Sequence, residues 1–185
     1  MSTASATPGR IGQALNFDGV NDYIALGSPA VLDDIVNLTT CAWVNPDGTA
    51  DGSIVTKDDS TTGWNVYYTE ADGRARFVRG WSGGDAFWQT GSGVIPDSTW
   101  THICLSYNDS STTNDPAFYI NGALVSSTET VAPSGTPNSD ATFVGAIGSY
   151  GNGLNDFFDG KIDEVRVYNR VITSAEVTQL YNLGR

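Results

Sequence analysis

Apolar and polar residues alternate along the chain in short runs, and clusters of turn-forming residues separate the runs every eight to twelve residues. Successive side chains of a strand point to opposite faces, so this spacing is typical of a β-sandwich or barrel. We expect strands at Ala14–Phe17, Asp22–Leu26, Leu38–Asn45, Gly52–Thr56, Trp64–Thr69, Arg74–Arg79, Ala86–Thr90, Thr101–Tyr107, Ala117–Ile120, Ala141–Val144 and Ile162–Tyr168.

The pattern changes near the end of the chain and in two polar runs. Thr173 and Glu176 have the spacing of a capping box, which predicts one short helix close to the C-terminus. The runs 108–115 and 130–140 are rich in turn-forming and polar residues, so we expect them to be loops.

The alternation also assigns the residues of two expected strands to faces. In Leu38–Asn45 and Thr101–Tyr107, most aliphatic side chains share one face, which we expect to form the core between two sheets. The opposite face carries Cys41 in the first strand, and His102 and Cys104 in the second. Both cysteines therefore lie on the same outer side, and they could pair if the two strands are neighbours.

Composition and charge narrow the class of partner. The chain has 185 residues, a length that suits one domain, and 21 acidic against 9 basic side chains give a net charge of −12. This charge argues against nucleic acid as a partner, because phosphate binding needs clustered Lys and Arg. It disfavours anionic membranes for the same reason. The apolar runs are too short for a membrane span, so we expect no membrane insertion.

Five segments of the sequence together resemble a known family. They are ALNFDGVNDYIALG from Ala14, LTTCAWVNPD from Leu38, WTHICLSYND from Trp100, AFYINGALV from Ala117 and FFDGKIDEVRVYNRVITSAEV from Phe157. Their order and spacing resemble the laminin-G-like, concanavalin A-like jelly-roll domains. The resemblance implies an all-β fold of two antiparallel sheets with about six or seven strands each, packed as a jelly-roll sandwich. We expect a flexible segment over residues 1–10 and one such domain over residues 11–185.

Cys41 and Cys104 resemble the paired cysteines of pentraxins, in which the later cysteine lies in a similar HIC strand. The resemblance implies a disulfide, which would place the protein outside the cytosol. The alternative is two buried free thiols, which are common for cysteine.

The resemblance also implies a structural calcium ion. In related jelly rolls an acidic residue of the early strand turn meets the aspartate of the I-D-E-V strand. Asp18 and Asp163 match these positions, and Asp22 or Asn21 is the third candidate ligand. In the alternative interpretation Asp18 only forms a turn and Asp163 is its hydrogen-bond partner. The loop pair Asp58-Asp59 is a second candidate for binding a ligand or a metal.

The sequence lacks the motifs of catalysis on this fold. Glycosidases with this fold generally carry a strand motif resembling E-x-D-x-x-E, which does not occur here. Asp163 and Glu164 are adjacent, so on a strand they point to opposite faces and cannot act as a catalytic pair. His102 has no evident nucleophile as a partner, and we interpret it as structural. We therefore expect that the protein is not an enzyme.

Aromatic residues are concentrated in the segment 64–88, which suggests a carbohydrate site. Sugar rings stack on aromatic faces, and planar polar groups form hydrogen bonds with the sugar hydroxyls. Trp81 is flanked by small residues, which predicts an accessible ring. The other candidate contacts are Arg79, Asp85, Trp88, Trp64, Tyr150 and Asn155. For Trp64 and Trp88 the alternative is a place in the core.

These observations lead to one hypothesis and one rival. The hypothesis is a non-catalytic, lectin-like module that binds a glycan or polysaccharide and holds a structural calcium ion. The rival is a protein–protein, cell-adhesion or structural module with an extracellular protein as its partner. In both cases we expect the domain to be secreted or displayed at the cell surface as part of a larger protein.

Overall fold

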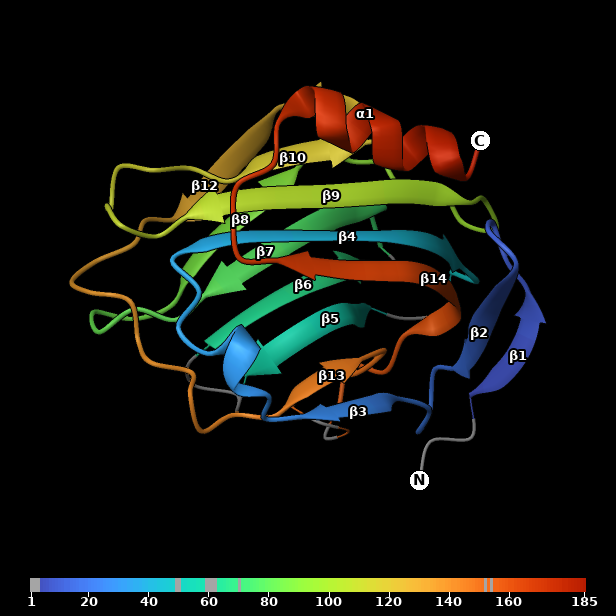
Figure 1. Ribbon diagram of the computed structural model, residues 1–185, viewed down its shortest axis with the longest axis horizontal. Helices are drawn as coiled ribbons and strands as arrows, with labels where there is room; N and C mark the ends of the chain where they lie inside the picture. The colour runs from blue at the N-terminus through green and yellow to red at the C-terminus, as the bar shows by residue number, and fades with distance from the viewer. Residues whose placement is uncertain (1–3, 49–50, 59–62, 70, 152, 154) are drawn as a thin grey trace.

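Two antiparallel sheets of seven strands each pack face to face, as a computed structural model of the protein shows (Figure 1). The structure describes residues 4–48, 51–58, 63–69, 71–151, 153 and 155–185. The arrangement confirms the expected jelly-roll sandwich. None of the helices in these ranges has the length and apolar character needed to cross a membrane.

The first sheet, sheet A, lies nearer the viewer in Figure 1. Its strands, in spatial order, are β1 (Ser5–Pro8), β2 (Gln13–Asp18), β14 (Asp159–Tyr168), β4 (Asn37–Pro46), β9 (Thr101–Asn108), β10 (Ala117–Ile120) and β11 (Ala123–Val125). The second sheet, sheet B, consists of β12 (Ser127–Val131), β8 (Ala86–Thr90), β7 (Arg74–Arg79), β6 (Gly63–Thr69), β5 (Gly52–Asp58), β13 (Gly145–Ile147) and β3 (Ile24–Gly27). A short 3-10 helix (Ala30–Leu32) and the helix α1 (Ser174–Leu183) complete the fold.

Most expected strands are confirmed, and four differences stand out. β1 lies inside the segment 1–10 that we expected to be flexible, and it pairs with β2. β11 and β12 were not expected either. The predicted strand at Ala141–Val144 is wrong, because the strand there is β13, which begins at Gly145. The chain turns immediately before it, where the N–H of Phe143 donates to the carbonyl of Asp140.

The expected short helix is confirmed as α1, and its start follows from the sequence. The hydroxyl of Thr173 accepts from the N–H of Glu176 at 3.3 Å, and the carboxylate of Glu176 accepts from the N–H of Thr173 at 2.7 Å. This reciprocal capping box satisfies two N–H groups that have no partner within the helix.

The expected faces of β4 and β9 are confirmed. Leu38, Ala42 and Val44 pack in the core between the sheets, together with Ile103 and Leu105. On the other side of sheet A, a smaller apolar cluster lies between the sheet and α1. It consists of Cys41, Cys104, Tyr119, Ile172 and Val177.

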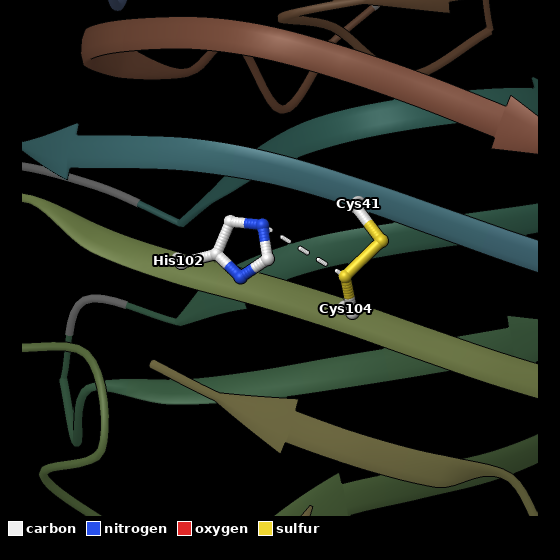
Figure 2. Close-up of side chains that lie close together, drawn as sticks. All are labelled: Cys41, His102 and Cys104. Carbon is white, nitrogen blue, oxygen red and sulfur yellow. Dashed lines mark hydrogen bonds between the residues drawn. A yellow bond between two sulfur atoms is a disulfide. The ribbon is translucent and has the colours of Figure 1, made fainter. Parts of the chain in front are cut away.

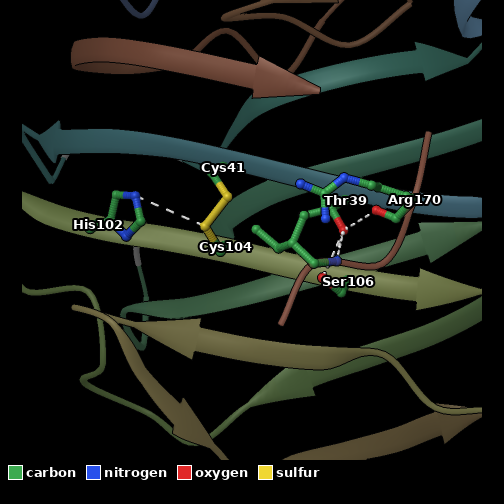
Figure 3. The surroundings of a disulfide bond; sticks show 7 residues. Thr39, Cys41, His102, Cys104, Ser106 and Arg170 are labelled. Atoms are coloured by element: carbon green, nitrogen blue, oxygen red, sulfur yellow. Dashed lines mark hydrogen bonds between the residues drawn. A yellow bond between two sulfur atoms is a disulfide. The ribbon is translucent and has the colours of Figure 1, made fainter. Parts of the chain in front are cut away.

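Cys41 and Cys104 form a disulfide, as the resemblance implied. They lie directly opposite each other in the pairing of β4 with β9, and both are buried in the cluster under α1. Thr39 lies on the same strand as Cys41 and fixes the segment that leads into α1 (Figure 3): its hydroxyl donates to the carbonyl of Arg170 at 2.7 Å and accepts from the N–H of Ile172.

His102 is structural, as we expected. Its ring lies beside the disulfide, with Nε2 3.9 Å from Sγ of Cys104 (Figure 2), and it packs against the rings of Trp43 and Tyr181. Its Nδ1 atom is buried, and none of the residues that the structure describes bonds it. Burial lowers the pKa of His102 to about 4, and the positive charge of Arg166 acts in the same direction. His102 is therefore neutral in the folded protein near pH 7.

A network of buried charges joins five segments at one end of the sandwich. Nζ of Lys57, on β5, contacts Asp33 Oδ1 at 2.7 Å and Asp140 Oδ1 at 3.1 Å. Arg79, on β7, contacts Asp109 Oδ2 at 2.9 Å and Asp140 Oδ2 at 3.6 Å. Asp140 is completely buried between the two cations. The network therefore fixes the loops before β4, after β9 and before β13 against sheet B.

Acidification should destabilise the protein through His102, the single histidine of the chain. The unfolded chain takes up a proton near pH 6.5 and the folded chain only near pH 4, so the stabilisation is complete above pH 6.5 and is lost as the pH falls. We expect the free energy of unfolding to decrease by about 2 kcal/mol between pH 7 and pH 5. Urea titrations at both values measure this change. A His102→Gln variant with the same decrease would contradict the assignment.

Removing the cation at the centre of the charge network should destabilise the fold strongly. Lys57→Met keeps the length of the side chain but leaves the buried carboxylate of Asp140 without its nearest cation. We expect a loss of about 3–5 kcal/mol in the free energy of unfolding. Arg170→Gln is the matched control, because its ion pair with Glu176 is exposed and should contribute little to stability. Equal effects of the two substitutions would exclude a special role for the network.

Candidate functional site

The tryptophans expected to bind sugar are core residues. Trp64, Trp81 and Trp88 are 2%, 3% and 1% exposed, and all three belong to the cluster between the sheets. For Trp64 and Trp88 this confirms the alternative interpretation. The prediction of an accessible ring at Trp81 is wrong. The segment after β12 crosses the glycine-rich turn at this position, where Ser82 and Gly83 donate backbone hydrogen bonds to Thr136 and Ser134, and Trp81 itself forms a bridge with Pro137.

Arg79 is also unsuited to contact a ligand in the way we expected. It is 3% exposed and holds Asp109 and Asp140 in the buried charge network. Its neighbours in the sequence suggested a glycine-rich binding loop, but its side chain points to the inner side of β7, in register with Trp64 of β6. Arg79 therefore supports the fold at this end of the sandwich.

The outer side of sheet B carries a different set of side chains. On β6, β7 and β8 the inner positions belong to the core, and the positions between them point outward. We call this surface the open face; its residues are Asn65, Tyr67, Arg76, Val78, Phe87 and Gln89. It is the counterpart of the surface of sheet A that α1 covers.

The open face contains a hollow of about 270 Å³. Its lining consists of Tyr67, Arg76, Phe87, Trp88, Gln89 and Thr130. Nε of Arg76 donates to Oε1 of Gln89 at 3.0 Å, and the guanidinium lies 6.0 Å from the ring centre of Tyr67. Aromatic rings and planar polar groups thus alternate across three neighbouring strands. Such an arrangement can stack on a ring-shaped ligand and bond its hydroxyl groups.

A buried amide lies on the same face beside Tyr67. Asn65 is 4% exposed, and its Nδ2 donates to Oγ of Ser53 at 3.0 Å. Its Oδ1 atom is buried without a hydrogen-bond partner among the described residues. Such an acceptor is costly for a fold, and because the atom is buried it is not itself available to a ligand on the open face.

Carboxylates surround the phenol groups near this face. The hydroxyl of Tyr150 donates to Oδ1 of Asp58 at 3.1 Å. Burial raises the pKa of Tyr150, and the charges of Asp58, Asp85 and Asp156 act in the same direction. Burial likewise raises the pKa of Asp156, and nearby Asp51 adds to this shift. The structure thus brings two predicted site residues, Asp85 and Tyr150, into one neighbourhood.

Asn155, another predicted sugar contact, lies next to Tyr150 and bonds it through its backbone. Its carbonyl accepts from the N–H of Tyr150 at 2.9 Å, and the residue itself is exposed. Of the acidic pair proposed as a second loop site, Asp58 bonds Tyr150, whereas Asp59 lies outside the described residues.

Of the residues that line the hollow, Trp88 was predicted as a site residue, whereas Tyr67, Arg76, Phe87, Gln89 and Thr130 were not. A usable signal was present, since Tyr67, Arg76, Phe87 and Gln89 all occupy strand positions that alternate with core residues. Two hairpins in succession place such positions side by side on one face.

The three carboxylates expected to bind calcium do not come together. Asp18 lies opposite Asp159 in the pairing of β2 with β14, four residues from Asp163, which is about 13 Å along a strand. Oδ1 of Asp18 accepts from three backbone N–H groups, those of Val20, Asn21 and Asp22. These positions do not fit a shared calcium site, so the prediction is corrected for this set of residues.

Asp163 has a structural role that the sequence did not reveal. Its Oδ2 atom accepts from the N–H groups of Arg10 at 2.7 Å and Ile11 at 2.9 Å, in the turn between β1 and β2. The alternative interpretation named Asp18 as its partner, but the carboxylate holds this turn instead.

Replacing Asp163 should therefore weaken the fold in a calcium-independent way. Asp163→Asn removes the charge from two charge-assisted hydrogen bonds, and we expect a loss of about 2 kcal/mol in the free energy of unfolding. Thermal unfolding of wild type and variant, each with calcium and with a chelator, measures the effect. A loss that appears only when calcium is present would show that Asp163 is a metal ligand after all.

Comparisons with known proteins place this geometry in a family. The chain is similar to domain 4 of AbnA, a GH43 extracellular arabinanase of Geobacillus stearothermophilus solved with arabinotriose (25% identity, TM-score 0.64, covering 98% of this chain and 82% of that one). It is also similar to the IT-sialidase CBM40 of Ruminococcus gnavus bound to alpha2,3 sialyllactose (12% identity, TM-score 0.69, 91% and 96% covered).

A third similar structure is the binding domain of Paraclostridial Mosquitocidal Protein 1, at 17% identity and a TM-score of 0.74. There the match covers 98% of this chain but only 46% of that one. No curated protein sequence matches the chain. The family model described as the concanavalin A-like lectin/glucanases superfamily matches residues 18–178, and the chain belongs to this superfamily.

Proposed function

We propose that the protein is a non-catalytic carbohydrate-binding module and that the open face of sheet B is its binding surface. The observation that carries the proposal is the hollow in which Tyr67 and Phe87 lie beside Arg76 and Gln89. Rings that stack and planar groups that donate and accept hydrogen bonds are what a sugar requires.

Two further observations support this proposal. The similar structures include modules solved with arabinotriose and with sialyllactose, although the fold alone does not determine a ligand. In addition, the hollow is built on strands that the core fixes from behind through Trp64, Phe77 and Trp88. A surface fixed in this way loses little conformational entropy when it binds.

The proposed module functions outside the cytosol, a location that agrees with the disulfide between Cys41 and Cys104. A non-catalytic role agrees with the position of His102, which is buried under α1 on the other sheet and is inaccessible to a substrate on the open face. In the proposed site, side chains contact the ligand directly and not through a metal ion. We therefore expect binding to persist when calcium is removed.

The test is a glycan and polysaccharide screen followed by calorimetry on the variants Tyr67→Ala and Phe87→Ala. For a glycan that binds, each variant should weaken binding about tenfold or more, because truncated aromatic contacts typically cost above about 1.4 kcal/mol. Tyr168→Ala is the matched control. This tyrosine also lies beside an arginine, Arg170 at 5.7 Å, but on sheet A next to α1.

The outcomes separate the candidate functions. A groove of about 280 Å³ lies beside α1, between Tyr168, Ile172 and Leu180. Loss of binding in Tyr168→Ala with unchanged binding in Tyr67→Ala would move the site to this groove. Binding to no glycan by folded protein would reject the proposal and favour a protein partner.

A further inference from the structure

Arg76 forms no ion pair with a carboxylate in the part of the chain that the structure describes, although the protein is strongly acidic. The chain carries 21 acidic and 9 basic side chains. Ion pairs hold Lys57, Arg74, Arg79, Arg166 and Arg170. Among the described residues, the polar partners of Arg76 are the neutral amide of Gln89 and the neutral phenol of Tyr67, and Asp72 acts on it only at longer range. The arginine that lines the hollow thus lacks an ion-pair partner among the described residues, despite the excess of carboxylates.

The position of this guanidinium is fixed before any ligand arrives. Gln89 occupies Nε, and Tyr67 lies against the guanidinium. The terminal amino groups therefore remain without an anionic partner inside a half-buried hollow. A planar guanidinium with its Nε held in place offers two parallel N–H donors, which is the geometry that a carboxylate accepts most strongly.

We propose that the open face recognises an acidic glycan and that Arg76 pairs with its carboxylate. This inference rests on the proposed function and names the class of ligand within it. The ring of the acidic sugar stacks beside Tyr67 or Phe87, and its carboxylate accepts from Arg76. Arg76 is thus a specificity-determining residue, whereas the aromatic rings contribute to binding of any sugar.

The surrounding charges oppose this pairing at longer range. Asp51 and Asp156 act on Tyr67, and the protein as a whole carries a net charge of −12. Salt screens such repulsion beyond a Debye length of about 8 Å at physiological ionic strength, but it screens a direct contact much less. The proposal therefore predicts that acidic glycans bind better at physiological salt than at low salt.

Pairs of glycans that differ in charge test the proposal directly. We would compare oligouronates with their fully methyl-esterified forms, and sialyllactose with lactose, by calorimetry at physiological ionic strength. For a pair that binds, the charged member should bind about tenfold more tightly than the neutral one, since a charge-assisted contact contributes about 1.5–3 kcal/mol. Arg76→Gln should remove this preference and keep the weaker binding of the neutral member.

Arg74→Gln is the matched control on the same strand. Arg74 is the same residue type two positions away, but it already pairs with Asp72. We expect this variant to keep the preference for the charged member. Circular dichroism of both variants would establish that they are folded.

The measurements distinguish a failure of acidic-sugar recognition from a failure of carbohydrate binding as a whole. Recognition of an acidic sugar is overturned if neutral glycans bind as tightly as charged ones, or if Arg76→Gln leaves the preference unchanged. In both cases the proposed carbohydrate-binding function still holds. If no glycan of the screen binds the folded protein, both are rejected.

Discussion

The buried charges around Asp140 are the constraint on which the rest of the structure depends. Lys57 and Arg79 extend inward from sheet B and reach carboxylates of three separate loops, which meet at the left of Figure 1. A buried ion without its partner costs several kcal/mol, so these loops cannot leave the sheet while the protein is folded. Because Lys57 and Arg79 point inward, the residues next to them on β5 and β7 must point outward.

That alternation connects the core to the candidate site. Phe77 and Arg79 point inward on β7, so Arg76 and Val78 must point outward. By the same alternation, Phe87 and Gln89 point outward on β8, whereas Trp88 between them points into the core. The hollow on the open face is therefore a direct consequence of the packing between the sheets, and a register shift of one residue would exchange the two sets.

Features with a local or periodic cause could be predicted from the sequence. The strand alternation gave the faces of Cys41 and Cys104, and the spacing of Thr173 and Glu176 gave the cap of α1. Trp81 was misjudged because its cover comes from the segment after β12, more than fifty residues later in the chain. The partners of Asp163 were missed for the same reason, since they lie about 150 residues before it.

Because α1 covers sheet A, the two outer faces of the sandwich differ in how readily they tolerate substitutions. The disulfide and the helix place nearly all outward side chains of β4 and β9 under packing constraints. Among the described residues no helix covers the outward side of β6, β7 and β8, where Asn65 and Val78 are buried but Tyr67, Arg76, Phe87 and Gln89 are partly exposed. Substitutions at these four positions can therefore change what the face binds with little effect on the interior, while the opposite face preserves the scaffold.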